Sequence, residues 1–423
     1  MAPKQVNPRW AAYAAVSAVG LIATTVAAGV SGLWVLTALP IGFLFGFFLQ
    51  KGDLCGSAAF SEVILMRDGR KVWGLWVAIV VSMLGFALLA RLGWVALAPK
   101  PMLWLSFLVG GIIFGVGTVL AGGCISGCLY KAGTGNLNSM AAILGIFFGI
   151  ALVEYGPLQA FKGYLKTYVF KAADGAPVTF SSTTGLSFGA LALILGALTA
   201  VLALVLFRRR SRKLAGVAEN TAEKSGLVER ALTRSWKPWQ AGIAIGLLGM
   251  AAYLSSAASG RNYPLGVTHG VVYAGMLVAD HDFDHVYRKA AVPVPGSAAA
   301  PAAAKSSGSK KIVWWLVGLV PCMVLGSWVA GRMSGQARLL PKPPDETIIA
   351  VGGGLFVGAG AGLADGCVIG NILSGVGLMS VGAAIFAVAT VLANWAAAHF
   401  YLIGGGLSPD SLKRTFCFWK GDR

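Results

Sequence analysis

Charged residues are scarce in this chain. Only 12% of its 423 residues are Asp, Glu, Lys or Arg, whereas a soluble domain carries about 25%. Hydrophobic residues make up 57%, and the mean hydropathy is +0.74. This composition excludes an ordinary soluble domain. It predicts a protein that spans a lipid bilayer, where backbone polar groups must be satisfied inside helices.

Acidic residues are scarcer than basic ones. The chain has 16 Asp and Glu and 34 Lys and Arg, which gives a net charge of +18. The basic residues lie in short connections between apolar segments, as they do in cytoplasmic loops, so we expect no nucleic-acid partner. The alternating pattern of a membrane β-barrel and any nucleotide-binding motif are also missing. The six cysteines lack the spacing of a disulfide framework. We predict an all-α polytopic membrane protein that is not an enzyme and needs no cofactor.

Ten segments are long and apolar enough to cross a bilayer. Six are uninterrupted, at residues 10–36, 72–98, 137–160, 185–207, 312–330 and 379–403. Four contain Gly, Pro or polar residues, at 38–66, 101–132, 239–279 and 347–376. Irregular backbone at membrane depth is tolerated only where protein or water covers it. We therefore expect each interrupted segment to be a crossing plus a shorter half-helix that dips into the protein.

One phrase of the sequence occurs twice, at a constant offset of 243 residues. Residues 110–127 and 353–370 are identical at nine of 18 positions, and the shared positions include a cysteine. Each phrase belongs to a longer unit of alternating broken and straight segments, at 38–160 and at 239–403. Five crossings separate the starts of these units. Because an odd number inverts the second unit, we predict two inverted repeats, as in many transporters.

These boundaries divide the chain into five parts. They are an extra N-terminal transmembrane helix (1–37), a first membrane repeat (38–207), a basic linker (208–238), a second membrane repeat (239–403) and a tail (404–423). The Ala, Pro, Ser, Gly and Lys composition within 280–311 predicts a flexible loop in the second repeat. Lys and Arg are concentrated on the side that holds the N-terminus, the linker and the tail, which predicts that both termini are cytoplasmic.

Three cysteines lie at helix breaks: Cys55, Cys124 and Cys367. A half-helix that starts near mid-membrane points free N–H groups and a positive dipole end into the gap, which favours an anion. A thiol adds a weak S–H donor on a soft, polarisable atom. A small anion with a terminal sulfur or selenium would suit such a lining, so these cysteines are the candidate substrate-binding residues.

Small residues around the two repeated cysteines are expected to shape the pathway. The candidates are Gly122, Gly123, Gly127, Gly366, Gly370, Asn371 and Cys128. We expect Gly122-Gly123 and Gly366 to let the chain turn at positive φ before each half-helix. The glycines at 111 and 115, and at 354 and 358, share helix faces and allow close backbone approach. Cys128 follows Cys124 by four residues, and its repeat partner is Asn371.

Ionisable residues at membrane depth are candidates for function. Asp365 directly precedes Gly366-Cys367, and its carboxylate would oppose an anion unless it is neutral, paired or turned away. For Arg91 and Glu154 we favour snorkelling at the interface. Arg261 is a weak counterpart of Lys51, in an alignment that matches Cys55 with Leu265. His281 and His285 lie among aspartates but are better explained by a solvated loop, so we predict no metal site.

Four motifs resemble the YeeE/YedE family of bacterial inner-membrane proteins. They are Leu120-Ala-Gly-Gly-Cys-Ile-Ser-Gly127, its copy Leu363-Ala-Asp-Gly-Cys-Val-Ile-Gly370, Cys55-Gly-Ser-Ala-Ala-Phe60 and Tyr263-Pro-Leu-Gly-Val-Thr268. The resemblance implies an importer of thiosulfate, with inverted repeats that form an hourglass. Three cysteines line its narrow waist, and by motif they correspond to Cys55, Cys124 and Cys367. The implied mechanism is relay of the anion between thiols by S–H···S contacts.

Several functions remain open at this point. The main hypothesis is a permease that imports a small sulfur-containing anion, thiosulfate first. A branch of the family associated with selenium metabolism leaves a selenium compound as an alternative substrate. A second hypothesis is a membrane thiol–disulfide redox protein that uses Cys124 and Cys128 as a pair. A third is a scaffold or sensor that hands sulfur to a cytoplasmic sulfur-carrier protein.

Overall fold

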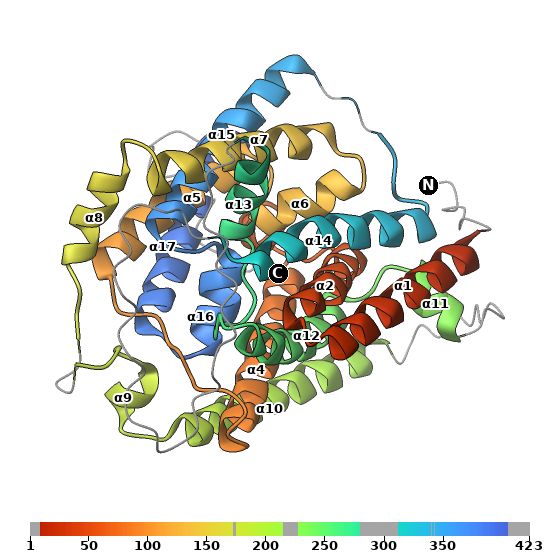
Figure 1. Ribbon diagram of the computed structural model, residues 1–423, viewed down its shortest axis with the longest axis horizontal. Helices are drawn as coiled ribbons and strands as arrows, with labels where there is room; N and C mark the ends of the chain where they lie inside the picture. The colour runs from red at the N-terminus through yellow and green to blue at the C-terminus, as the bar shows by residue number, and fades with distance from the viewer. Residues whose placement is uncertain are drawn as a thin grey trace.

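The protein is an all-helical bundle in the part of the chain that the structure describes. The computed structural model describes residues 9–171, 175–214, 227–279, 312–339, 341 and 343–404. Every regular element among them is a helix, and ten helical segments are long and apolar enough to cross a membrane (Figure 1). The predicted fold class is therefore confirmed. The predicted loop 280–311 and nearly all of the tail lie outside the described residues.

Six segments are single crossings, as the sequence predicts. They are α1 (Trp10–Ser31), α4 (Arg70–Arg91), α7 (Leu137–Glu154), α10 (Phe188–Leu214), α14 (Trp314–Met333) and α17 (Val381–Ala397), which the π-helical η3 (Ala398–Leu402) extends. Two of them end earlier than predicted because a glycine in left-handed conformation follows, Gly32 at φ +65° and Gly93 at φ +71°. The short helices that connect the crossings are η1 (Trp34–Thr37), α8 (Gln159–Thr167), α9 (Phe180–Thr184) and α11 (Leu227–Thr233).

The four interrupted segments are broken helices, which also agrees with the prediction. The pairs are α2 (Ala38–Gly52) with α3 (Gly56–Leu65), α5 (Trp104–Leu120) with α6 (Ile125–Gly133), and α12 (Pro238–Ala258) with α13 (Thr268–Ala279). In the fourth, α15 (Pro344–Leu363) is followed by the π-helical η2 (Val368–Leu373) and then by α16 (Ser374–Gly377). Three of the breaks span three or four residues, at 53–55, 121–124 and 364–367, and the fourth spans nine, at 259–267.

The helix contacts follow a pseudo-two-fold relation between the two units. The broken helix α2 of the first unit packs on α14, and its counterpart α12 packs on α4. In the same way α5 packs on α17, and its counterpart α15 packs on α7. Each of these helices also contacts its own counterpart at the centre of the bundle, α2 with α12 and α5 with α15. Five candidate membrane spans separate the start of α2 from the start of α12, so the two units are inverted relative to each other.

Glycines allow these helices to pack backbone against backbone. A Cβ on Gly46 of α2 would overlap the carbonyl oxygen of Met323 in α14, and one on Gly326 of α14 would overlap that of Phe43 in α2. Gly354 and Gly358 of α15 likewise face the backbone of α7, as the sequence predicts. Such contacts bring helix axes close together without a hydrophobic driving force, which lipid does not supply.

Two crossings lie at the edge of this core. Only 6% of the α1 span and 11% of the α10 span is buried inside the protein, against 50% or more for the spans that contain α2, α5, α12 and α15. Figure 1 shows α1 and α10 on the outside of the bundle. Their apolar side chains therefore face lipid, and the broken helices are shielded at the centre, where irregular backbone is permitted.

Replacing Gly46 with alanine should lower stability, because the new methyl group overlaps backbone that cannot move alone. Overpacking of this kind costs roughly 1–3 kcal/mol. Gly20→Ala is the matched control, since a Cβ on Gly20 of α1 would meet no neighbouring element of the described chain within 4 Å. The thermal midpoint of the detergent-purified protein measures both. Equal midpoints for the two variants would contradict the close α2–α14 contact.

Candidate functional site

Each of the three candidate cysteines occupies the same position at a break, the residue that directly precedes a half-helix. Cys55 is the N-cap of α3, Cys124 that of α6 and Cys367 that of η2, all with extended backbone. All three thiols are fully buried. An N-cap residue stands beside the free N–H groups of the first turn. The three thiols therefore share one electrostatic environment, at the positive end of a half-helix.

The turns before these cysteines depend on left-handed residues. Gly122 has φ +66°, as predicted, but neither Gly123 nor Gly366 takes a positive φ, and the expectation for these two glycines is wrong. The repeat partner of Gly122 is Asp365, which takes the left-handed conformation at φ +49°. Gly366 is needed for space instead, because a Cβ there would lie 2.7 Å from Asn371 Oδ1 and 2.9 Å from Lys100 Nζ.

Two of the thiols lie beside the same glycine. A Cβ on Gly127 would overlap Cys55 Sγ and would lie 3.5 Å from Cys124 Sγ. Gly127 therefore makes room for the sulfur of Cys55 beside α6. Cys367 joins this group through its neighbour Val368, whose side chain packs against Gly56 at the start of α3. The three breaks thus converge at the centre of the bundle.

On the side of Cys124, a lysine holds the broken backbone. Lys131 Nζ donates to the carbonyl oxygen of Gly122 at 2.8 Å. Tyr130 donates to Asp53 Oδ1 at 2.8 Å, and Asp53 also pairs with Lys71 at 2.6 Å. Lys131 remains as a cation without a carboxylate partner among the ion pairs of the described residues.

On the side of Cys367, another lysine plays the same part. Lys100 Nζ donates at 2.6 Å to the carbonyl oxygen of Asp365, the repeat partner of Gly122, and at 2.6 Å to Asn371 Oδ1. Lys100 precedes α5, and Gly122 follows it. The two lysines therefore lie toward opposite ends of a helix about 25 Å long.

A pocket opens beside Lys100. Its lining residues are Lys100, Arg261, Tyr263, Gly266, Thr268, His269, Leu316, Asp365, Gly366 and Gly370. Arg261 donates at 2.8 Å to the carbonyl oxygen of Pro264, and its guanidinium lies over the rings of Tyr263 and Trp315. Tyr263 donates at 2.6 Å to the carbonyl oxygen of Gly370. A guanidinium stays charged at neutral pH.

Asp365 is paired, so its carboxylate does not stand as a free charge against an anion. Its two oxygens lie 2.6 Å from Lys162 Nζ and 2.5 Å from Lys166 Nζ, both on α8. Lys162 also bonds Glu154 Oε1 at 2.6 Å. The snorkelling expected of Glu154 is therefore wrong. This carboxylate turns inward because a lysine and a histidine are there to receive it.

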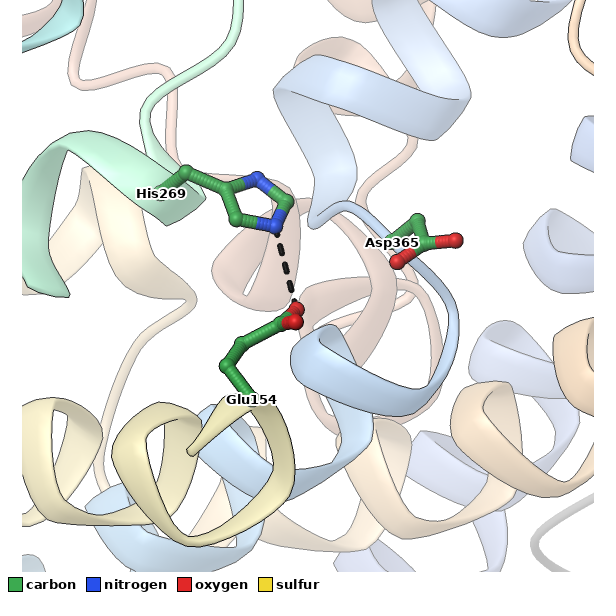
Figure 2. A group of neighbouring side chains, drawn as sticks. All are labelled: Glu154, His269 and Asp365. Carbon is green, nitrogen blue, oxygen red and sulfur yellow. Dashed lines mark hydrogen bonds and ion pairs between the residues drawn. The ribbon is translucent and has the colours of Figure 1, made fainter. Parts of the chain in front are cut away.

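The group formed by Glu154, His269 and Asp365 has the spacing of a metal site. Figure 2 shows the His269 imidazole and the Glu154 carboxylate pointing toward each other, with Asp365 on the turn beside them. The ring Nε2 lies 3.1 Å from Glu154 Oε1. Lys162 and Lys166 already neutralise both carboxylates, and two lysine charges oppose a cation. The group is better understood as an ion-pair network that fixes the turn before Cys367.

Cys128 and Asn371 perform the same task in the two repeats. Cys128 Sγ lies 3.9 Å from the carbonyl oxygen of Ala121. Asn371 Nδ2 donates to Ala364, the repeat partner of Ala121, at 3.2 Å. Each side chain thus caps the carbonyl end of the preceding long helix. Cys128 is buried and its thiol is directed to a carbonyl, so a helix-capping role accounts for it.

The fourth break carries no thiol in its described residues, 259–267. The residue that precedes α13 is Val267, whose carbonyl accepts from Val271 N at 3.2 Å. It stands two residues after Leu265, the position that the weak sequence alignment matched with Cys55. Cys322 lies inside α14, away from the breaks. Cys417, His281 and His285 lie outside the described residues.

Sequence reasoning missed most of the cationic pocket. Lys100, Lys162 and Lys166 looked like ordinary loop residues, because they fall between crossings. The only signal for Thr268 was its place at the end of the Tyr263–Thr268 motif. Lys100 is separated by 265 positions from Asp365, and no spacing rule relates them.

The fold and the site define a polytopic membrane protein with a duplicated core of broken helices and buried thiols at its centre. Residues 51–396 match the family described as Sulphur transport, and the chain belongs to this family. It is 29% identical over 371 residues to the thiosulfate transporter TsuA of Spirochaeta thermophila, with 85% of this chain and 96% of that protein covered.

Two further relatives agree with this assignment. The chain is 28% identical to the thiosulfate transporter TsuA of Escherichia coli, with 86% of this chain and 93% of that protein covered. It is 30% identical over 120 residues to a probable transporter, YedE, of Salmonella typhimurium, with 28% and 29% covered. The protein is therefore a multi-pass membrane protein of sulfur-anion transport, and not an enzyme.

Cys128→Ser should fold and transport nearly as well as the native protein, because a hydroxyl also donates to the Ala121 carbonyl. Cys128→Val removes the donor at similar volume and should lower the thermal midpoint, since a lost buried hydrogen bond costs about 1–3 kcal/mol. Thermal midpoints and uptake by matched amounts of each variant provide the measurement. Abolished activity in Cys128→Ser would instead indicate a thiol with a redox role.

Proposed function

We propose that the protein is a permease that imports thiosulfate by passing it between the thiols of Cys55, Cys124 and Cys367. The observation that carries this proposal is the placement of all three thiols at N-caps of half-helices that meet at the centre of the bundle. Thiosulfate has a soft terminal sulfur and a hard oxygen end. An S–H donor at the positive end of a helix suits the terminal sulfur.

Weak contacts favour passage over storage. Each thiol is a weak donor, and each half-helix contributes only a fraction of a charge at its end. An anion beside one thiol and its half-helix end is therefore stabilised without being trapped. The next thiol along the pathway offers the same contact. Conduction requires binding that is strong enough for entry and weak enough for exit. The position of the Cys55 and Cys124 thiols beside the same residue, Gly127, supports transfer from one thiol to the next.

Cations stand at both approaches to the thiols. Lys131 holds the turn before Cys124, while Lys100 and Arg261 line the pocket beside the turn before Cys367. Lining of one sign raises the local concentration of an oppositely charged substrate. This arrangement supports an anion as the transported species and gives it a cationic approach from either end of α5.

The orientation follows from the loop charges. Basic residues in the N-terminal segment, the 208–238 linker and the tail support an orientation with both termini in the cytoplasm of a bacterial inner membrane. The Lys100 pocket then faces outward, and Lys131 faces the cytoplasm. Transport from the pocket toward Lys131 is import. A cytoplasmic sulfur-carrier protein is a partner that fits delivery at that end.

A selenium compound is the alternative substrate. The same lining of thiols and cations accepts an anion that carries a terminal selenium, because selenium is also soft and polarisable. A redox function receives less support, since Cys128 is directed to a backbone carbonyl. The observation in favour of a redox function is that the Cys55 and Cys124 thiols both lie beside Gly127.

Cys367→Ala should reduce uptake of labelled thiosulfate at least about tenfold in cells that lack other sulfate and thiosulfate importers, because one station of the relay is lost. Cys322→Ala is the control, since Cys322 lies in α14 and away from the breaks. Variants are compared at equal membrane abundance. Native-like uptake by Cys367→Ala would remove the relay, and no uptake by the well-inserted native chain would remove thiosulfate.

A further inference from the structure

We propose that the pocket formed by Lys100, Arg261 and the N-terminus of α13 is a binding site for the oxygen atoms of a divalent oxoanion. The site deepens the proposed function and rests on it, because it recognises the hard end of the substrate and leaves the soft end for Cys367. Its ligand class is a tetrahedral dianion, which includes thiosulfate and sulfate. Binding here is a separate property from passage through the thiols.

An unpartnered hydroxyl points to a ligand at this place. Thr268 is the first residue of α13 and lines the pocket. Its side chain is only 3% exposed, and Oγ1 has no hydrogen-bond partner among the described residues. A buried hydroxyl without a partner is costly. An oxyanion in the pocket would accept from this hydroxyl and from the free N–H groups of the first turn of α13, a helix of 12 residues.

Two cations in the pocket lack a carboxylate partner within the described part of the chain. Lys100 donates to a backbone carbonyl and an amide oxygen, and Arg261 donates to Ser256, Tyr263 and Pro264. Among the ion pairs between described residues, neither cation takes part. Hydrogen bonds to neutral oxygens orient these side chains but leave their charge uncompensated.

The local charges balance for a dianion. The carboxylates near the pocket belong to Glu154 and Asp365, and they form ion pairs with Lys162 and Lys166. Lys100 and Arg261 then contribute two positive charges that face the pocket. A divalent anion neutralises both, whereas a monovalent anion leaves one charge unmatched. We therefore expect dianions to bind more tightly than monovalent anions of similar size.

The pocket lies beside the turn that contains Cys367, so a ligand bound there can present its soft end to the Cys367 thiol. Gly366 and Gly370 line it on either side of Cys367 in the sequence. A Cβ on Gly370 would meet no atom of the described residues within 4 Å, so the backbone is open there. Oxygens held by Lys100, Arg261 and Thr268 allow a terminal sulfur to reach toward Cys367. Sulfate lacks that soft atom, so it should bind here and compete without being passed on.

The test is direct binding of sulfate and thiosulfate to the full-length, detergent-purified protein by titration calorimetry. The native protein should bind both anions competitively and bind nitrate much more weakly. Thr268→Val should weaken sulfate binding about tenfold, because a hydrogen bond to a charged ligand is lost. Thr268→Ser should restore it. Arg261→Gln should weaken sulfate binding further.

Matched controls separate this site from general damage. Thr390→Val removes the other unpartnered buried hydroxyl of the described residues, which lies in α17 and not in the pocket. Arg91→Gln removes a cation at the end of α4. Both should bind sulfate as the native protein does. Native-like affinity in Thr268→Val and Arg261→Gln, or nitrate binding as tightly as sulfate, would overturn the proposal.

The outcomes also separate this inference from the proposed function. Sulfate and thiosulfate binding that depends on Thr268, in a protein without thiosulfate uptake, supports the site and removes the permease. Uptake that depends on Cys367, in a protein whose sulfate affinity is unchanged by Thr268→Val and Arg261→Gln, supports the permease and removes the site. If Arg261→Gln fails to fold, the sulfate affinities of Thr268→Val and Thr268→Ser still decide whether the pocket is an anion site.

Sulfate affinity should fall as the pH rises through about 8. Burial lowers the pKa of Lys100 to about 8, against smaller opposing effects of nearby negative groups. Below that pH Lys100 is charged and attracts the dianion, and above it the attraction is lost. The charged and titratable groups that face it are Asp365, Cys367, Arg261, Lys166 and Tyr263.

Lys100→Arg tests this pH dependence, because a guanidinium stays charged throughout the range. Its sulfate affinity should change little between about pH 7 and about pH 9, while that of the native protein declines. Dissociation constants are measured in buffers of equal ionic strength, since salt screens such a site. A parallel decline in both proteins would show that another group is responsible.

Discussion

The rest of this structure depends on one constraint: backbone that is broken at membrane depth must find partners other than water. Each break leaves carbonyls at the end of a long helix and N–H groups at the start of a half-helix. The carbonyls of Gly122 and Asp365 accept hydrogen bonds from lysines, and Tyr263 donates to the carbonyl of Gly370 inside η2. The side chains that satisfy the broken backbone also bring positive charge to the approaches of the three thiols.

The two repeats satisfy equivalent groups with different chemistry. Gly122 and Asp365 both take the left-handed turn, but only the second carries a carboxylate, which α8 must neutralise with two lysines. Cys128 and Asn371 both cap an alanine carbonyl. The duplication fixes where the breaks lie, and substitutions at matched positions make the two approaches unlike. The side with Asn371 has the pocket rich in cations, while the side with Cys128 has two thiols beside Gly127.

Local signals in the sequence predicted the broken helices, since glycine, proline and polar residues interrupt otherwise apolar runs, and the 243-residue repeat located the cysteines. The N-cap positions of Cys55, Cys124 and Cys367 follow from those signals. The pocket could not be predicted, because Lys100 and Arg261 come from connections and Thr268 from the start of α13, and tertiary packing sets which of them become neighbours. Gly366 illustrates the limit. A glycine before a half-helix suggested a turn, yet the turn falls on Asp365 and the glycine makes room for Lys100.

Separating the charged pocket from the thiols resolves a conflict in moving a dianion through a protein. Strong pairing with cations selects the anion but opposes its release. A water-free centre without any charge, in contrast, excludes the anion. Here the uncompensated cations stand beside the break and not at the centre, where buried thiols and half-helix ends offer only partial charges. Selection by charge at the edge and passage by soft contacts at the centre can then be tuned independently. In the pathway that we propose, binding at the pocket would govern which anions enter, and the thiols would govern which of them continue.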